Sequence, residues 1–296
     1  MYKLVVVDLD GTLLNSYGIV TENTKKVIKE TINNGTDVVI ASGRSVMDYM
    51  KNISKEIGSK NYFIAGNGAI VYDIKNDKTI YKKYLNKNKV LEIIKECEKN
   101  SIYYNIYTKN AIITKSLNYN TLYYHKENLK KEEDKRTVIN IVENPYKYVE
   151  NSDEDFLKIA ICDNDEIIFN SIIKELKKIK NIEILETEHM ASKKIKQGTQ
   201  EISVEYFYTE ITRAGVDKWE TILFLTETMG IKPEEVIAIG DNINDYKMIQ
   251  NAGIGIAMGE SMPKVKQIAD YVTEDNNNEG VANALQKYIT NILQKY

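Results

Sequence analysis

The chain has 296 residues, a formal net charge of −3 and 43% apolar residues, which is typical of a soluble protein with one large or two moderate domains. Nucleic-acid binding is not expected, because it needs clustered positive charge, and a membrane span would need about 18 consecutive apolar residues, which do not occur. The first residues have the pattern of a strand rather than a secretory leader, so we expect a cytoplasmic protein.

The first part of the chain alternates apolar strands with amphipathic helices. We predict strands at 4–7, 37–41 and 62–65, and helices at 24–32 and from after Arg44 to about residue 57. Strands that are covered on both faces are unbroken apolar runs, so these strands belong to a parallel sheet with right-handed crossovers. Asn67-Gly68 joins two further apolar runs and predicts a hairpin.

The pattern changes between about Tyr84 and Ile211, where strands and helices follow one another irregularly. We predict helices at 87–99 and 166–179, a polar helix or loop up to residue 136, and strands at 103–107, 111–114, 157–161, 182–185 and 203–210. These elements indicate an α+β module with an antiparallel sheet.

The last part of the chain returns to the first pattern. We predict helices at 218–229, at 245–251 and from about 279, and strands at 236–239, 254–257 and 271–272. The fold class is therefore α/β: a Rossmann-like parallel-sheet core, formed by residues 1–83 and 212–296, is interrupted by an inserted α+β domain at 84–211.

The strongest chemical signal is the segment Asp8-Leu9-Asp10-Gly11-Thr12, directly after the first predicted strand. Ligands of open parallel sheets bind beyond the carboxyl ends of the strands, so both carboxylates are expected at a binding site. Two carboxylates so close together repel each other, and a cation between them would relieve that cost.

Further polar residues follow other predicted strands. Ser42-Gly43 offers a hydroxyl and backbone N–H groups at an expected helix start, which is a phosphate-binding arrangement. The segment 240–245 adds Asp241 and Asp245, whose oxygens suit Mg²⁺. Lys218 opens a predicted helix and can neutralise a phosphoryl group.

These segments together resemble the motifs of the haloacid dehalogenase superfamily: Asp8-x-Asp10-Gly11-Thr12, then Ser42-Gly43-Arg44, then Lys218, then Gly240-Asp241-x-x-Asn244-Asp245. The resemblance covers nearly the whole chain. The inserted domain resembles, in position and size, the large α+β cap (type IIB) of the Cof-like hydrolases.

The resemblance implies a Mg²⁺-dependent phosphatase that acts on a small phosphorylated metabolite, either a sugar phosphate or a cofactor phosphate. Asp8 would become an aspartyl-phosphate, and Asp10 would serve as general acid and base. The metal would be held by Asp8, the Asp10 carbonyl and Asp241. The phosphoryl group would contact Ser42, Gly43, Lys218 and Asn244, and Asp245 would orient Lys218 or a metal-bound water.

Some residues are interpreted more cautiously. Trp219 stands where the family commonly has glycine, and we expect it to be buried packing. Arg44 and Asn67 are candidate substrate contacts or ordinary loop residues. This chemistry needs neither the two histidines, His125 and His189, nor the two cysteines, Cys97 and Cys162. We expect sheet packing to account for most of the tyrosines.

Two other functions stay open at this point. A phosphomutase would use the same aspartyl-phosphate and transfer it onward, and a non-catalytic sensor would keep the fold and bind a phosphorylated ligand. The presence of both Asp8 and Asp10 counts against the sensor. The partner is expected to be a small molecule rather than nucleic acid or membrane, and the protein to be a monomer or a homodimer.

Overall fold

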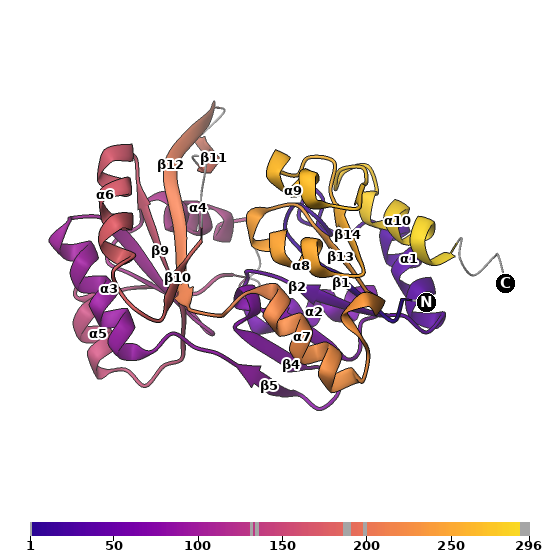
Figure 1. The fold of residues 1–296 in the computed structure, drawn as a ribbon. Coiled ribbons are helices and arrows are strands. Elements are labelled where there is room, and N and C mark those ends of the chain that lie inside the picture. The colour runs from indigo at the N-terminus through magenta and orange to yellow at the C-terminus, as the bar shows by residue number, and fades with distance from the viewer. Residues whose placement is uncertain (1, 131–132, 134–135, 186–190, 198–199, 291–296) are drawn as a thin grey trace. The chain divides into compact units, whose positions relative to one another are not determined.

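The computed structural model describes residues 2–130, 133, 136–185, 191–197 and 200–290, and its chain divides into two compact units. The first unit combines the residues up to Lys82 with those from Val216 onward, and the second spans Lys83–Gly215. The second unit is thus inserted into the first (Figure 1).

The first unit is built on an eight-stranded sheet with the strand order β15-β14-β13-β1-β2-β3-β4-β5. The strands from β15 to β3 are parallel, whereas β4 and β5 are antiparallel and extend one edge. The strands are β1 (Leu4–Val7), β2 (Asp37–Ala41), β3 (Tyr62–Ala65), β4 (Ile70–Asp73), β5 (Lys78–Lys82), β13 (Val236–Gly240), β14 (Ile254–Ala257) and β15 (Tyr271–Val272).

Helices cover both faces of this sheet, which explains the unbroken apolar runs of its central strands. Leu4 and Val6 of β1 pack in an apolar cluster with residues of α7, α8 and α9. The helices α1 and α2 contact β2, and α10 contacts α1. The helices are α1 (Glu22–Asn33), α2 (Met47–Ile57), α7 (Lys218–Met229), α8 (Tyr246–Asn251), α9 (Pro263–Ile268) and α10 (Gly280–Leu285).

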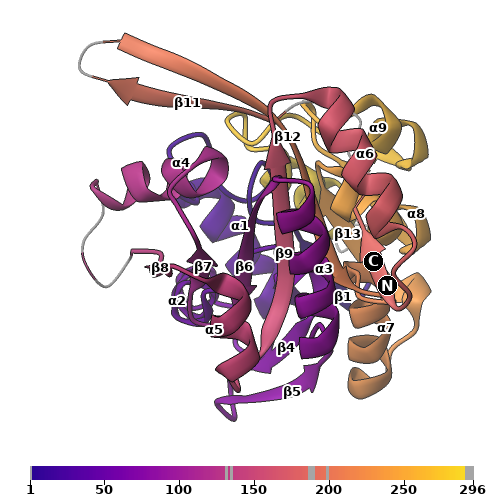
Figure 2. The same cartoon turned by 90° about the vertical axis from the view of Figure 1, so that its left-hand side faces the viewer.

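The second unit has its own mixed sheet, with the order β10-β12-β9-β6-β7-β8 and β11 paired to β12. The helices α3, α5 and α6 lie together on one face of it (Figures 1 and 2). Its strands are β6 (Tyr103–Thr108), β7 (Ile112–Thr114), β8 (Ile139–Ile141), β9 (Phe156–Asp163), β10 (Ile182–Ile184), β11 (Ala191–Gln197) and β12 (Gln200–Arg213). Its helices are α3 (Lys87–Lys99), α4 (Tyr119–Asn128), α5 (Pro145–Asn151) and α6 (Glu166–Leu176).

The predicted α/β class with an inserted α+β domain is confirmed, and two details of the prediction were wrong. The inserted sheet is not purely antiparallel, because β7 and β8 pair in parallel. The helix after β2 begins at Met47 rather than near Ser42-Gly43, so these two residues lie in a loop. Five elements were not predicted, because they are short or lack a clear apolar period: β5, β8, β11, α5 and α9.

The predicted hairpin after β3 is confirmed. β3 and β4 pair antiparallel and are joined by the turn Gly66–Gly68. Asn67 lies in this turn with a φ of 57°, in the left-handed region that asparagine tolerates better than most residues. Among the described residues, no helix is long and apolar enough to cross a membrane.

Candidate active site

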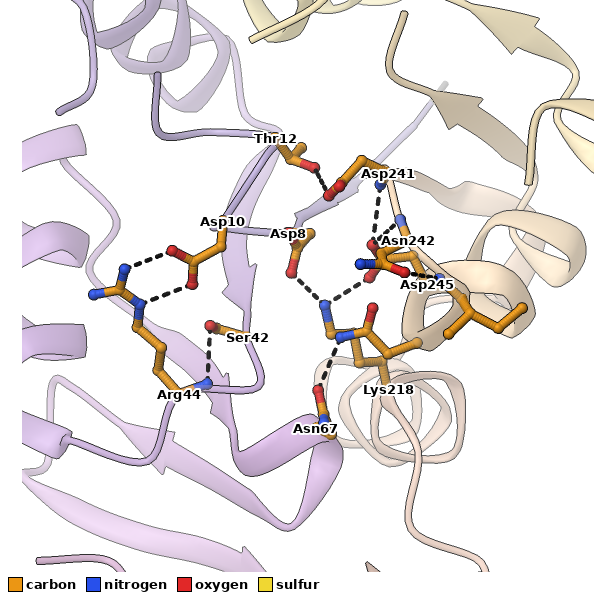
Figure 3. Close-up of polar contacts among 12 residues, drawn as sticks. Asp8, Asp10, Thr12, Ser42, Arg44, Asn67, Lys218, Asp241, Asn242 and Asp245 are labelled. Carbon is orange, nitrogen blue, oxygen red and sulfur yellow. Dashed lines mark hydrogen bonds and ion pairs between the residues drawn. The ribbon is translucent and has the colours of Figure 1, made fainter. Parts of the chain in front are cut away.

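The predicted site residues of the first unit gather at the carboxyl ends of three neighbouring strands. Asp8 directly follows β1, Ser42 directly follows β2 and Asp241 directly follows β13, and these strands are adjacent in the sheet. Lys218 is the first residue of α7, whose start is capped by the Asp217 carboxylate, which accepts a hydrogen bond from the Glu220 N–H at 2.8 Å. Figure 3 shows Lys218 directed at the carboxylates.

Three carboxylates and one ammonium form the centre of the site. One carboxylate oxygen of each of Asp8, Asp241 and Asp245 lies within 4.8 Å of the other two. The Lys218 ammonium donates hydrogen bonds to Asp8 and, at 2.6 Å, to Asp245. Asp8, Asp245 and Lys218 are all buried, so a single positive charge faces three carboxyl groups away from bulk water.

The electrostatics of this cluster favour the binding of a cation. Burial and the charge of Asp245 raise the pKa of Asp8 well above its usual value, although Lys218 opposes the shift. Burial and Asp245 likewise raise the pKa of Asp241 to about 7. Burial lowers the pKa of Lys218, but Asp245 and Asp8 outweigh this effect and raise it above the usual value. Lys218 therefore stays charged. Its one positive charge does not balance the charge of the three neighbouring carboxylates.

The carboxylates are held by specific contacts. The Thr12 hydroxyl donates to Asp241 at 2.9 Å, and the second oxygen of Asp245 accepts the backbone N–H groups of Asp241 and Asn242. Gly11 has a φ of 86°, and a Cβ there would lie 2.6 Å from an Asp241 carboxylate oxygen. The Asp8-to-Thr12 segment thus lies close to Asp241 at both Gly11 and Thr12.

This donor set fits a divalent cation such as Mg²⁺. Asp245 is engaged by Lys218 and by two backbone N–H groups, so the carboxylates of Asp8 and Asp241 are the better candidates to bind a metal. Hard oxygen ligands of this kind, one or two carboxylates with waters and substrate oxygens, are what Mg²⁺ requires.

Asp10 has a different environment from Asp8. Its side chain is half exposed and forms a two-point ion pair with Arg44, with the Arg44 Nε 2.7 Å from one carboxylate oxygen and Nη2 2.5 Å from the other. The Arg44 guanidinium also lies over the ring of Tyr49, 4.4 Å from its centroid. Figure 3 shows the Asp10 carboxylate directed at Arg44 and away from Asp8.

The remaining predicted residues surround the site on one side. The buried Ser42 hydroxyl accepts a hydrogen bond from the Arg44 N–H at 3.1 Å. The Asn244 side chain donates to the Asn67 Oδ1 at 3.0 Å, and a Cβ at Gly43 would lie 2.8 Å from that same oxygen. The structure thus brings all ten predicted residues into the first unit, with Asp10 paired to Arg44 rather than to the acidic cluster.

Sequence reasoning gave no role to two residues that contact the site. Thr12 was within the predicted motif, and its hydroxyl donates a hydrogen bond to the Asp241 carboxylate. Tyr49, which lies under Arg44, had no local signal, because its position on α2 is not distinguished by sequence. Trp219 is buried in the apolar cluster of α7, as predicted.

The residues judged unnecessary for the chemistry are part of the second unit where the structure describes them. Cys97 and Cys162 are buried free thiols of the second unit, as predicted. His125 is on α4 of the same unit, and His189 lies outside the described residues.

Comparison with known proteins gives consistent results. The family model of haloacid dehalogenase-like hydrolases matches residues 5–285. The chain is 27% identical to the 5-amino-6-(5-phospho-D-ribitylamino)uracil phosphatase YcsE of Bacillus subtilis, over 97% of this chain and 96% of YcsE. A haloacid dehalogenase-like hydrolase from Bacteroides thetaiotaomicron is 26% identical, with a TM-score of 0.76 over 97% of this chain and 99% of its own. The fold is also that of the subclass IIB sugar phosphatase BT4131, with 21% identity and a TM-score of 0.75 over 97% and 98% of the two chains.

Proposed function

The chain belongs to the haloacid dehalogenase-like hydrolases and is a phosphatase of that family, and from this premise we propose that it cleaves a small phosphorylated metabolite through an aspartyl-phosphate on Asp8. The observation that carries the proposal is the pairing of the buried Asp8 carboxylate with the Lys218 ammonium, beside Asp241. This arrangement provides a nucleophile, a cation for the phosphoryl oxygens and a metal-binding carboxylate at one point.

The proposed substrate is a sugar phosphate or a cofactor phosphate. YcsE acts, by its name, on a phosphoribityl compound, which is a small phosphorylated metabolite. The second unit, which has a mixed sheet as in the type IIB fold, is the proposed source of substrate selectivity.

In the first step Asp8 attacks the phosphorus, and the bond between phosphorus and the leaving oxygen breaks. The leaving oxygen takes a proton from Asp10, which must first turn away from Arg44. In the second step Asp10 accepts a proton from water as this water attacks the phosphorus, which frees Asp8 and inorganic phosphate. The acid form of Asp10 is thereby restored.

The other residues stabilise the charge that develops on the phosphoryl group. Lys218 would donate to a phosphoryl oxygen, together with the Ser42 hydroxyl, the Gly43 N–H and the Asn244 amide. Asp245 would hold Lys218 in place through their 2.6 Å contact. Mg²⁺, when held by Asp8, Asp241 and the Asp10 carbonyl, supplies positive charge that offsets the charge of phosphate and carboxylates. Arg44 remains a candidate contact for the rest of the substrate.

The test is phosphate release from a panel of sugar phosphates, nucleotides, flavin mononucleotide and pyridoxal phosphate, with Mg²⁺ or with chelator. We expect metal-dependent release that is lost in Asp8→Asn. A matched control is Asp37→Asn, a half-buried aspartate at the opposite end of β2, which should retain activity. Absence of release by folded, metal-loaded protein would contradict the proposal, and conversion of a hexose 1-phosphate to the 6-phosphate would instead support a phosphomutase.

A further inference from the structure

The turn Gly66–Gly68 connects segments that carry the proposed phosphate contacts. Its backbone N–H groups at Gly66 and Asn67 donate to the carbonyls of Arg44 and Ser42, at 2.9 and 3.0 Å. Its Gly68 carbonyl accepts the hydroxyl of Thr221 at 2.7 Å, one turn after the start of α7. The turn is therefore bonded both to the Ser42 loop and to the helix that presents Lys218.

The Asn67 side chain extends this connection to the Asn244 segment. Asn67 is only 8% exposed, and its Oδ1 accepts a hydrogen bond from the Asn244 Nδ2 at 3.0 Å. The same oxygen is so close to Gly43 that a Cβ there would lie 2.8 Å away. The Asn67 carboxamide is thus hydrogen-bonded to one of the residues proposed to bind phosphate and lies near another.

The contact fixes the orientation of the Asn244 amide. A carboxamide has a donor end and an acceptor end, and only the donor end can stabilise a phosphoryl oxygen. Because the Asn244 nitrogen donates one hydrogen to Asn67, its second hydrogen is held in a defined direction. An acceptor at Asn67 therefore selects the amide orientation that binds an anion.

We propose that Asn67 is a positioning residue for the phosphate site, acting through Asn244 rather than as the substrate contact that its sequence position suggested. The inference rests on the proposed function, since it concerns the same phosphoryl group. The left-handed backbone of Asn67 allows this role, because it points the side chain from the hairpin turn toward the Asn244 segment.

A double-mutant cycle on phosphate affinity tests the inference. The dissociation constant of inorganic phosphate is measured by calorimetry, with Mg²⁺ present, for wild type, Asn67→Gly, Asn244→Ala and the double variant. Glycine adopts positive φ without strain, so Asn67→Gly removes the amide but preserves the turn. Each single variant should weaken phosphate binding roughly tenfold, since each removes or misdirects one hydrogen bond to a charged group.

The double variant distinguishes positioning from direct contact. If Asn67 acts through Asn244, the double variant binds phosphate about as weakly as Asn244→Ala alone. A roughly hundredfold loss, the product of two independent tenfold effects, would show a separate contact and overturn the inference. Unchanged affinity in Asn67→Gly would overturn it as well.

Two controls separate this result from a loss of folding or of the proposed function. Asn181→Gly makes the same change at another left-handed asparagine, in the second unit, and should leave phosphate affinity and melting temperature unchanged. Wild-type protein that neither binds phosphate nor releases it from any substrate would count against the proposed function. Wild-type activity with an unaffected Asn67→Gly would count against the positioning role alone.

Discussion

Replacing Asp8 by asparagine should abolish turnover and nevertheless stabilise the protein when no metal is bound. The buried Asp8 carboxylate lies with Asp241 and Asp245 in a cluster whose carboxylate oxygens are within 4.8 Å of one another. Lys218 is the ammonium that contacts Asp8 and Asp245. Asparagine has nearly the same shape as aspartate, so the substitution removes a negative charge without leaving a cavity.

The magnitude follows from the charges. Two like charges 4.8 Å apart repel by about 3–4 kcal/mol at an effective dielectric constant of about 20, and Asp8 has two such neighbours. The attraction of Lys218 offsets much of this, burial adds to the cost, and protonation of Asp8 limits it. We expect Asp8→Asn to raise the free energy of unfolding by about 1–3 kcal/mol. Each kcal/mol corresponds to a rise in melting temperature of roughly 2–4 °C.

The size of the effect depends on pH, and its sign depends on bound metal. The folded-state pKa of Asp8 lies above its unfolded value, so below about pH 4 Asp8 is protonated in both states and costs nothing. Stability is lost as the pH rises through the folded-state pKa, and the gain from Asp8→Asn should grow in the same window. Bound Mg²⁺ should cancel or reverse the order, since Mg²⁺ at a free concentration 100 times its dissociation constant stabilises the wild type by about 2.7 kcal/mol.

Calorimetric melting of the wild type and Asp8→Asn, in chelator between pH 4 and 8 and again in Mg²⁺, measures both effects. Asp37→Asn serves as the control outside the acidic cluster, because Asp37 begins β2, at the end of the strand away from Ser42, and accepts a hydrogen bond from Asn61. A lower melting temperature of Asp8→Asn in chelator at pH 7 would show that the Lys218 pairing outweighs the repulsion, and the reasoning above would be refuted.

Three further substitutions test separate parts of the structure. Gly11→Ala should weaken Mg²⁺ binding at least tenfold by displacing Asp241, whereas Gly35→Ala, with a similar positive φ but open space around it, should not; metal titration followed by calorimetry compares the two. Trp219→Ala should lower the free energy of unfolding by about 3–5 kcal/mol in denaturant titration, because it opens a cavity in the apolar cluster; a change under about 1 kcal/mol would contradict this packing. Lys158→Met should destabilise the second unit by about 3–5 kcal/mol in thermal melts, because Glu210 is left buried without its 2.6 Å partner, and adding Glu210→Gln should restore most of that loss.

Much of the fold was predictable from local patterns. The apolar runs at 4–7 and 254–257 coincide with β1 and β14, because a strand covered on both faces needs apolar residues at every position. The same logic failed for β8, whose residues are largely exposed at the edge of the second sheet. The helix after β2 was placed too early, because nothing local shows that the loop carrying Ser42 continues to Val46.

The sequence by itself determined which residues would meet at the site, because the carboxyl ends of adjacent parallel strands share one edge of the sheet. This geometry places Asp8, Ser42 and Asp241 at that edge, and the adjacency of β13, β1 and β2 in the folded sheet brings them together. Only the tertiary structure decided how their side chains pair. Asn244 and Asn67 are 177 positions apart, and the Arg44 ion pair to Asp10 spans 34. Such pairings depend on the packing of separate loops, which no local pattern of residues encodes.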